Sequence, residues 1–175
     1  FGDHVYGTPA ASSASQVVSA DIRIGSTPTD GESSNPVSAL ANADDLAGWD
    51  DEDLTMPLFV PGASTSLNLP VYINSISTSR INVFVDWNGD GDVIDAGETQ
   101  TVQSVASSGT RSFSITPPIG TPLGTKFMRL RLTEGSTAPA FAGASSLRGE
   151  VEDYEIEVVN AASVAGKVFV DADSN

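Results

Sequence analysis

The residues from Asp86 to Glu98 have the types and the spacing of a cation-binding loop, with the order Asp-Trp-Asn-Gly-Asp-Gly-Asp-Val-Ile-Asp-Ala-Gly-Glu. Oxygen ligands at alternate positions can converge on one ion when the backbone curls around it. A glycine supplies the tight turn, and a late acidic residue completes the ligand shell. Asp86, Asn88 and Asp90 take positions one, three and five, and Gly91 takes position six, as in the opening of a helix-loop-helix calcium loop.

The end of this loop differs from the helix-loop-helix type. The closing glutamate of that type stands at position twelve, whereas Glu98 is thirteenth here, Gly97 is twelfth and Asp95 is tenth. A strand pattern precedes the loop, so the loop resembles the strand-borne calcium loops of extracellular modules. Hard oxygen ligands favour calcium over zinc or copper. The predicted calcium ligands are Asp86, Asn88, Asp90, Asp92, Asp95 and Glu98. The alternative is an acidic hairpin loop without an ion.

A second group of acidic residues is less regular. Two acidic runs, 44–45 and 50–53, precede a predicted strand, and 149–154 leads into another. These segments could meet around a second ion, with Asp44, Asp50, Asp51, Asp53, Glu150 and Asp153 as ligands. They could instead meet around Arg129 and Arg131. The alternative for 44–53 is a solvated loop, and for the two arginines an exposed strand face whose ion pairs contribute less than about 1 kcal/mol each.

The charge balance excludes several partners. The 175 residues hold 23 acidic and 8 basic side chains, for a formal net charge of −15. Binding to nucleic acid or to an anionic membrane surface needs Lys and Arg, so neither is expected. No Lys or Arg occurs between Ile24 and Ser79, where eight acidic residues stand. Concentrated carboxylates without counter-charges favour divalent cations as partners.

Residue types also argue against catalysis. The chain has no cysteine, which excludes disulfides, thiolate metal sites and cysteine nucleophiles. His4 is the single histidine, so no Ser-His-Asp triad away from the N-terminus and no two-histidine zinc site can form. We therefore expect no enzymatic activity. No apolar run reaches the length of a membrane span, so no membrane insertion is expected. Phe1 is not a natural start residue, which indicates a mature fragment or an excised piece of a longer protein.

Alternation of apolar and polar residues predicts an all-β fold. Strands are expected at 67–73, 81–85, 112–115, 128–132 and 154–159, and further strands at 17–24, 54–60 and 98–105. Pro70 predicts an edge strand or a bulge. Many short strands separated by turn residues favour an antiparallel β-sandwich of jelly-roll type with calcium-bound loops. A domain boundary near residue 161 divides the chain into a sandwich, 1–160, and the start of a following domain, 161–175. The alternative is that 167–171 is one more strand of the same sheet.

The pentapeptide Gly149-Glu150-Val151-Glu152-Asp153 resembles the signature of the GEVED domain. Other features similar to that family follow one another along residues 1–159: Phe1-Gly2-Asp3, Tyr6-Gly7-Thr8, Asp50-Asp51-Glu52-Asp53, Val60-Pro61-Gly62, Asp86-Trp87-Asn88-Gly89-Asp90-Gly91-Asp92, Ala96-Gly97-Glu98 and Met128-Arg129-Leu130-Arg131. Segment 26–29 departs from the family by holding fewer acidic residues, which puts any ligand there in doubt.

The resemblance implies a setting in large, multi-domain secreted and surface proteins of bacteria, beside adhesive or repeat modules. The tail 164–175 is similar to the opening strand of the B-type repeat of serine-aspartate repeat surface proteins, which are calcium-binding stalk units. The family implies no biochemical activity.

The sequence therefore favours a non-catalytic extracellular structural or adhesive module, stabilised by calcium and located in the medium or at the cell surface. Its expected partners are neighbouring domains of the same chain, other surface proteins, glycans, or further copies of itself in an S-layer-like assembly. The alternative function is a calcium-dependent carbohydrate-binding module, in which Tyr6, Trp49 and Trp87 are the candidate aromatic platforms.

Overall fold

A computed structural model describes residues 14–26, 41, 54–74, 78–100 and 103–162 of the chain. All its regular elements are strands: β1 (Ser15–Val17), β2 (Ile22–Ile24), β3 (Thr65–Ile73), β4 (Ser79–Asp86), β5 (Gln103–Val105), β6 (Gly109–Ile115), β7 (Gly124–Glu134) and β8 (Ala144–Val158). Among these residues no helix has the length and apolarity needed to span a bilayer. The acidic cluster at 44–53 lies outside the described residues.

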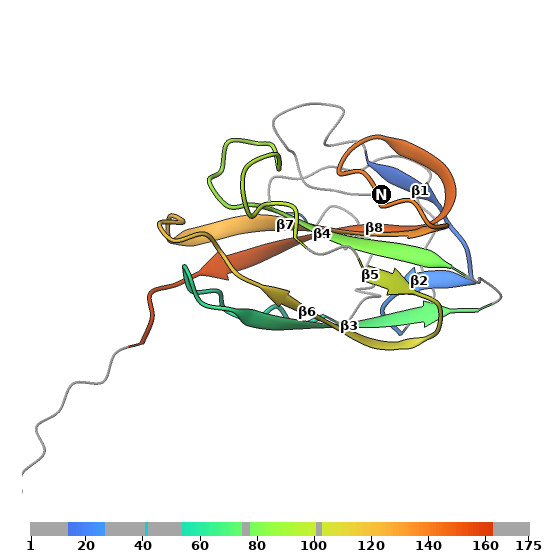
Figure 1. Cartoon of the computed structure of the whole chain (residues 1–175), viewed down its shortest axis with the longest axis horizontal. Coiled ribbons are helices and arrows are strands. Elements are labelled where there is room, and N and C mark those ends of the chain that lie inside the picture. Colours follow the sequence, from blue (N-terminus) through green and yellow to red (C-terminus); the bar gives the residue numbers. More distant parts are fainter. Residues whose placement is uncertain (1–13, 27–40, 42–53, 75–77, 101–102, 163–175) are drawn as a thin grey trace, which may run out of the picture.

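The strands form two sheets packed face to face (Figure 1). The larger sheet has the order β1-β8-β7-β4-β5 and the smaller one β2-β3-β6. Neighbouring strands are antiparallel except β1 and β8, which are parallel. The predicted all-β sandwich is confirmed. Its eight described strands divide five and three between the two sheets, and the jelly-roll type stays a prediction.

The core lies between the two sheets and follows the predicted alternation. Successive side chains of a strand point to opposite faces, so every second residue can enter the core. The buried inward positions are Ile22, Ile24, Leu67, Leu69, Val71, Ile73, Ile81, Val83, Val85, Phe113, Ile115, Met128, Leu130, Leu132, Ile156 and Val158. Full burial of one such aliphatic side chain stabilises the fold by about 1.5–3 kcal/mol.

The outer face of the larger sheet is buried as well, which the alternation did not predict. Segment 135–143, between β7 and β8, lies against it. Asn82 donates from Nδ2 to the carbonyl oxygen of Pro139 at 3.0 Å, and the rings of Phe84 and Phe141 lie 5.5 Å apart. The two covered faces explain why β4 is buried along nearly its whole length.

Three predicted strands differ in the structure. Segment 17–24 divides into β1 and β2, which belong to different sheets, so the chain crosses from one sheet to the other at this point. Segment 54–60 forms no strand, and only Phe59 bridges to Val158. Of the described residues in 98–105, only β5 is a strand, and Thr99 forms an isolated bridge with Phe84. Such short pairings are decided by the neighbouring strand more than by local pattern.

Pro70 lies in the central strand of the smaller sheet, contrary to the expected edge strand. The N and O atoms of a strand residue point to the same neighbour. The carbonyl oxygen of Pro70 accepts from the N–H of Gly25 at 2.9 Å, just beyond the end of β2. The missing N–H of Pro70 therefore faces the point where β2 has ended and interrupts no pairing with β6.

Gly149 is required because β8 passes close to the backbone of β7 at this position. A Cβ atom at this position would overlap the backbone carbonyl oxygen of Leu132. We expect Gly149→Ala to lower the free energy of unfolding by about 3 kcal/mol or more, because neither backbone can yield without loss of the β7–β8 ladder. Chemical denaturation measures this. Gly135→Ala is the matched control: its φ is also positive, +99°, but nothing lies within 4 Å of its Cβ position. Equal losses in the two variants would contradict the close approach.

Candidate metal centre

The predicted calcium loop begins where β4 ends and returns along the same strand. Val85 donates its N–H to the carbonyl oxygen of Glu98 at 2.8 Å, and Gln100 donates to Val83 at 2.8 Å. These two bonds close the loop at its base, so the ends of the segment 86–98 are fixed to a buried strand.

Asp86 shapes the first turn of the loop. Its Oδ1 accepts the N–H groups of Gly89 at 2.7 Å and Asp90 at 3.2 Å, and its Oδ2 accepts that of Gly91 at 2.8 Å. Both glycines have φ near +80° to +90°, a conformation that glycine adopts without strain. The alternation of acidic residues and glycines is thus used to wind the backbone around one carboxylate.

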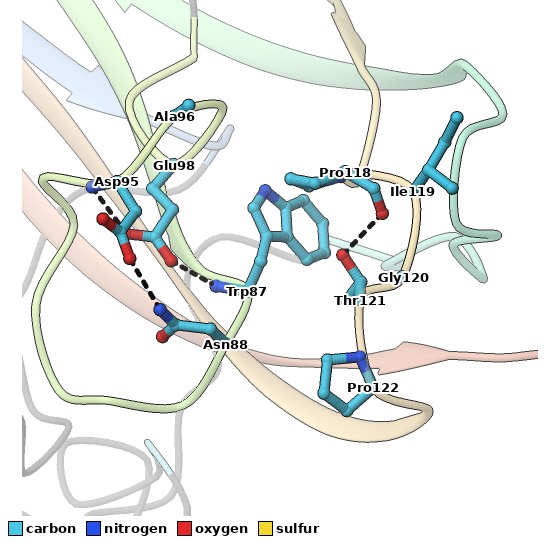
Figure 2. A pocket seen from close by; sticks show the side chains of 10 residues that line it. All are labelled: Trp87, Asn88, Asp95, Ala96, Glu98, Pro118, Ile119, Gly120, Thr121 and Pro122. Atoms are coloured by element: carbon cyan, nitrogen blue, oxygen red, sulfur yellow. Dashed lines mark hydrogen bonds between the residues drawn. The ribbon is translucent and has the colours of Figure 1, made fainter.

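Asn88 lies between two other predicted ligands. Its Nδ2 donates to Oδ2 of Asp90 at 2.9 Å and to Oδ2 of Asp95 at 2.7 Å, the second of which is visible in Figure 2. Two carboxylates from different parts of the loop therefore converge on one partly positive group. Asp92 takes a separate role, because its Oδ1 accepts the N–H of Ile94 at 3.0 Å.

Glu98 joins the two ends of the loop from a buried position. Its side chain accepts the N–H of Trp87 at 3.1 Å and that of Asp95 at 3.1 Å (Figure 2), and the residue is only 1% exposed. Burial raises the pKa of Glu98 above its usual value, and the charge of Asp86 acts in the same direction. The N–H groups of Asp95 and Trp87 oppose this rise without cancelling it.

The chemistry of this donor set suits calcium, because all six predicted ligands carry side-chain oxygen atoms. The geometry does not present a finished site: in the part of the chain that the structure describes, no group of three carboxylate or imidazole side chains is arranged to hold a metal ion. Several of the oxygens accept backbone N–H groups instead, although a carboxylate oxygen has a second lone pair to offer. Coordination would require the Asn88 amide to turn its oxygen inward. Calcium binding stays a prediction.

Trp87 anchors the loop in the core. It is 2% exposed, its Nε1 donates to the carbonyl oxygen of Gly97 at 3.1 Å, and its ring meets Phe59 edge-on with centroids 5.7 Å apart. Its ring is therefore not open to a sugar. Tyr6 and Trp49, the other candidate platforms, lie outside the described residues.

A cavity of about 240 Å³ lies beside the loop. Figure 2 shows Trp87 between the loop and the segment 118–122, with Asn88, Asp95 and Glu98 on the opposite side of the cavity from Pro118. The cavity therefore combines acidic groups with an apolar wall.

The structure does not bring Glu150 and Asp153 together around a second ion. The two residues lie on opposite faces of β8 because they are three positions apart. The carboxylate of Glu150 faces the smaller sheet and accepts the N–H of Ile24. Asp153 faces outward and accepts from Nε and Nη2 of Arg129, both at 2.7 Å. The remaining ligands predicted for this site, Asp44, Asp50, Asp51 and Asp53, lie outside the described residues.

The alternative that Arg129 and Arg131 lie on an exposed strand face is wrong. The side chains of Arg129 and Asp153 are both 0% exposed. Arg129 also donates from Nη1 to the carbonyl oxygen of Phe141 at 3.0 Å. The arginines are buried because segment 135–143 covers them, and a strand pattern carries no information about such a cover. The apolar residues Pro139 and Phe141 within that segment were the available signal.

Arg131 holds the covering segment by its backbone. Its guanidinium donates to the carbonyl oxygens of Ala140 at 2.9 Å, Ala142 at 3.2 Å, Gly143 at 2.9 Å and Ser15 at 3.1 Å. Burial, together with the charge of Arg129, lowers the pKa of Arg131 to about 10, so the group stays protonated at neutral pH.

The sequence match to a known family covers the strands and loop just described. Residues 80–157 match the GEVED domain. The matched segment begins in β4 and ends in β8, and it contains the acidic loop, both buried arginines and the pentapeptide 149–153. The GEVED resemblance is thus confirmed for this part of the chain. The match does not extend to 161–175, where the similarity to a B-type repeat stays a prediction.

Other known proteins add little. No curated protein sequence matches the chain. The solved structures that it resembles include the ASH/PapD-like domain of human CEP192 (PapD-like domain 7), at 14% identity and a TM-score of 0.33 over 62% of this chain and 82% of that one. A second is a family 123 glycoside hydrolase from Clostridium perfringens, at 15% identity and a TM-score of 0.33 over 80% of this chain and 27% of the hydrolase. Similarities this distant carry no functional argument.

We expect Asp153→Asn to lower the free energy of unfolding by about 3–5 kcal/mol, because it leaves the buried charge of Arg129 without its counter-charge. Denaturant titration of the purified variant measures this. Asp21→Asn is the control, because the Arg148–Asp21 pair is 37% and 36% exposed and should contribute less than about 1 kcal/mol. Similar losses in both variants would show that the buried pair is not what holds β7 to β8.

Proposed function

We propose that this chain is a non-catalytic structural or adhesive module of a secreted or cell-surface bacterial protein, stabilised by a calcium ion in the loop 86–98. The observation that carries the proposal is the convergence of Asp90 and Asp95 on the amide of Asn88, next to the buried carboxylate of Glu98. The match of residues 80–157 to the GEVED domain supports the structural and adhesive role.

The electrostatics of the loop favour a cation. Its thirteen residues hold five carboxylates and no Lys or Arg. Among the described residues, the ion pairs join Arg129 to Asp153 and Arg148 to Asp21 and Glu134, all outside the loop. A divalent ion would offset the repulsion in the folded state and would have no formed site in the unfolded chain. At calcium a hundredfold above the dissociation constant, that difference stabilises the fold by about 2.7 kcal/mol.

The burial of Glu150 and Glu152 in β8 supports a role without catalysis. Glu150 and Glu152 are the pair that most resembles a hydrolase carboxylate pair in sequence, and both face the inside of the sandwich at 4% and 6% exposure. A catalytic carboxylate must reach the substrate within hydrogen-bond distance. These two side chains contribute to packing between the sheets instead.

The proposal predicts a rise in melting temperature with millimolar calcium, relative to EGTA, that magnesium does not reproduce. Asp90→Asn and Asp95→Asn should each remove most of this rise, because each deletes one of the two converging charges. Glu155→Gln removes the charge of an exposed residue of β8 and should leave the calcium-dependent rise intact. A parent protein that melts identically in calcium and in EGTA would refute the calcium site.

The raised pKa of Glu98 predicts that the free energy of unfolding, measured in EGTA, depends on pH. Its pKa is raised in the folded state, so the stability it contributes is fully present below the ordinary glutamate value of 4.5 and is lost as the pH rises through the raised folded value. Glu98→Gln should remove this loss, because the amide has no proton to release. Urea titrations from about pH 4 to about pH 7 measure it.

Glu134→Gln gives a control of opposite sign. The N–H of Arg148 lowers the pKa of Glu134, so its contribution is present above the ordinary glutamate value and is lost as the pH falls through the lowered folded value. The two variants should change the pH profile in opposite directions. Identical profiles for parent and Glu98→Gln would show that Glu98 does not titrate above its usual range.

A further inference from the structure

Among the described residues, six of the seven exposed large apolar side chains lie near the two ends of β8, and the seventh, Ile94, lies in the acidic loop. Val17, Val18 and Leu147 lie near its start, where β1 runs alongside it, and are 46%, 49% and 42% exposed. Near its end, Leu58, Ile119 and Leu123 are 62%, 93% and 49% exposed. We refer to Leu58, Ile119 and Leu123 as the exit surface, because the chain leaves the sandwich beside them.

Backbone contacts hold the exit surface around Val158, the last residue of β8. Leu58 precedes Phe59, which bridges to Val158, and Leu123 precedes Gly124, which pairs with Val158 from the other side. Ile119 belongs to the adjacent segment: Gly62 donates its N–H to the carbonyl oxygen of Pro117 at 2.8 Å, and the Cβ position of Gly62 lies 3.0 Å from Cγ1 of Ile119.

We propose that residues 163–175 of this chain dock on the exit surface, so that the sandwich and the segment that follows it are joined by a packed interface and not by a free tether. The three residues 160–162 span at most about 11 Å, which places the start of the segment next to the exit surface. The segment supplies apolar side chains to cover it: Val164, Val168, Phe169 and Val170.

Charge complementarity supports the same occupant. The cavity beside the acidic loop has Pro118 and Pro122 on one side and the carboxylates of Asp95 and Glu98 on the other. A lysine side chain matches that lining, because its stem is apolar and its end is cationic. Lys167 is the one basic residue of 163–175 and stands directly before the apolar run 168–170. The two acidic residues of the segment, Asp171 and Asp173, follow the apolar run and so stand on its other side in the sequence from Lys167.

Disulfide trapping tests the docking, because the chain has no cysteine of its own. The full chain carrying Ile119→Cys and Phe169→Cys is oxidised under mild conditions, and the cross-linked fraction is followed with time. Docking raises the local concentration of the two thiols, so the cross-link should form roughly tenfold faster than in the control pair Glu155→Cys and Phe169→Cys. Glu155 is exposed and lies three residues before Val158, so a free tether reaches it as well.

Equal rates for the two pairs would overturn the proposal in favour of a free tether. Disulfide-linked dimers in place of the intramolecular product would overturn it in favour of a second copy as the occupant. The measurement is made in EGTA and again in calcium. The docking is judged in EGTA, because an ion held by Asp95 and Glu98 would compete with Lys167 for the same carboxylates.

A double-mutant cycle gives an independent reading in the full chain. Ile119→Ser and Phe169→Ser should each lower the free energy of unfolding. The double variant should lower it by no more than the larger of the two single losses, because both substitutions remove the same contact. Leu147→Ser combined with Phe169→Ser should be additive, since Leu147 lies near the opposite end of β8. Additive losses for the first pair would overturn the docking.

Discussion

The buried ion pair between Arg129 and Asp153 is the constraint on which the larger sheet depends. Two charges without solvent contact are tolerated only when geometry and hydrogen bonding repay the loss of water. Here both carboxylate oxygens accept from one guanidinium at 2.7 Å, and that guanidinium also donates to the carbonyl oxygen of Phe141. The pair therefore fixes the register of β7 against β8 and requires segment 135–143 to cover both.

The pentapeptide 149–153 combines several different tasks in five consecutive residues. Because β8 alternates its faces, Gly149, Val151 and Asp153 are turned to the side of the buried arginines, whereas Glu150 and Glu152 are turned to the smaller sheet. Gly149 allows the close crossing with β7, and Glu150 accepts a backbone N–H of β2 in the other sheet. One short run of β8 thus ties the two sheets and the covering segment together.

The same framework positions the acidic loop. β4 lies between β7 and β5 and carries the chain directly from the core into Asp86. The loop is then held at its base by backbone bonds to Val83 and Val85 and by the burial of Trp87. Because the base of the loop is held to buried residues, a cation bound there would stabilise the folded sandwich and not the loop alone.

The sequence by itself determined what depends on local order. The alternation of apolar residues located the main strands, and the spacing of Asp, Asn and Gly located a loop wound around Asp86, because both patterns act within a few residues. The tertiary structure alone decided what depends on a second segment. It divided 17–24 between two sheets, and it placed Arg129 and Arg131 under 135–143. It also separated Glu150 from Asp153 and gave each its own partner, because the cover of a strand face is set by chain segments far away in the sequence.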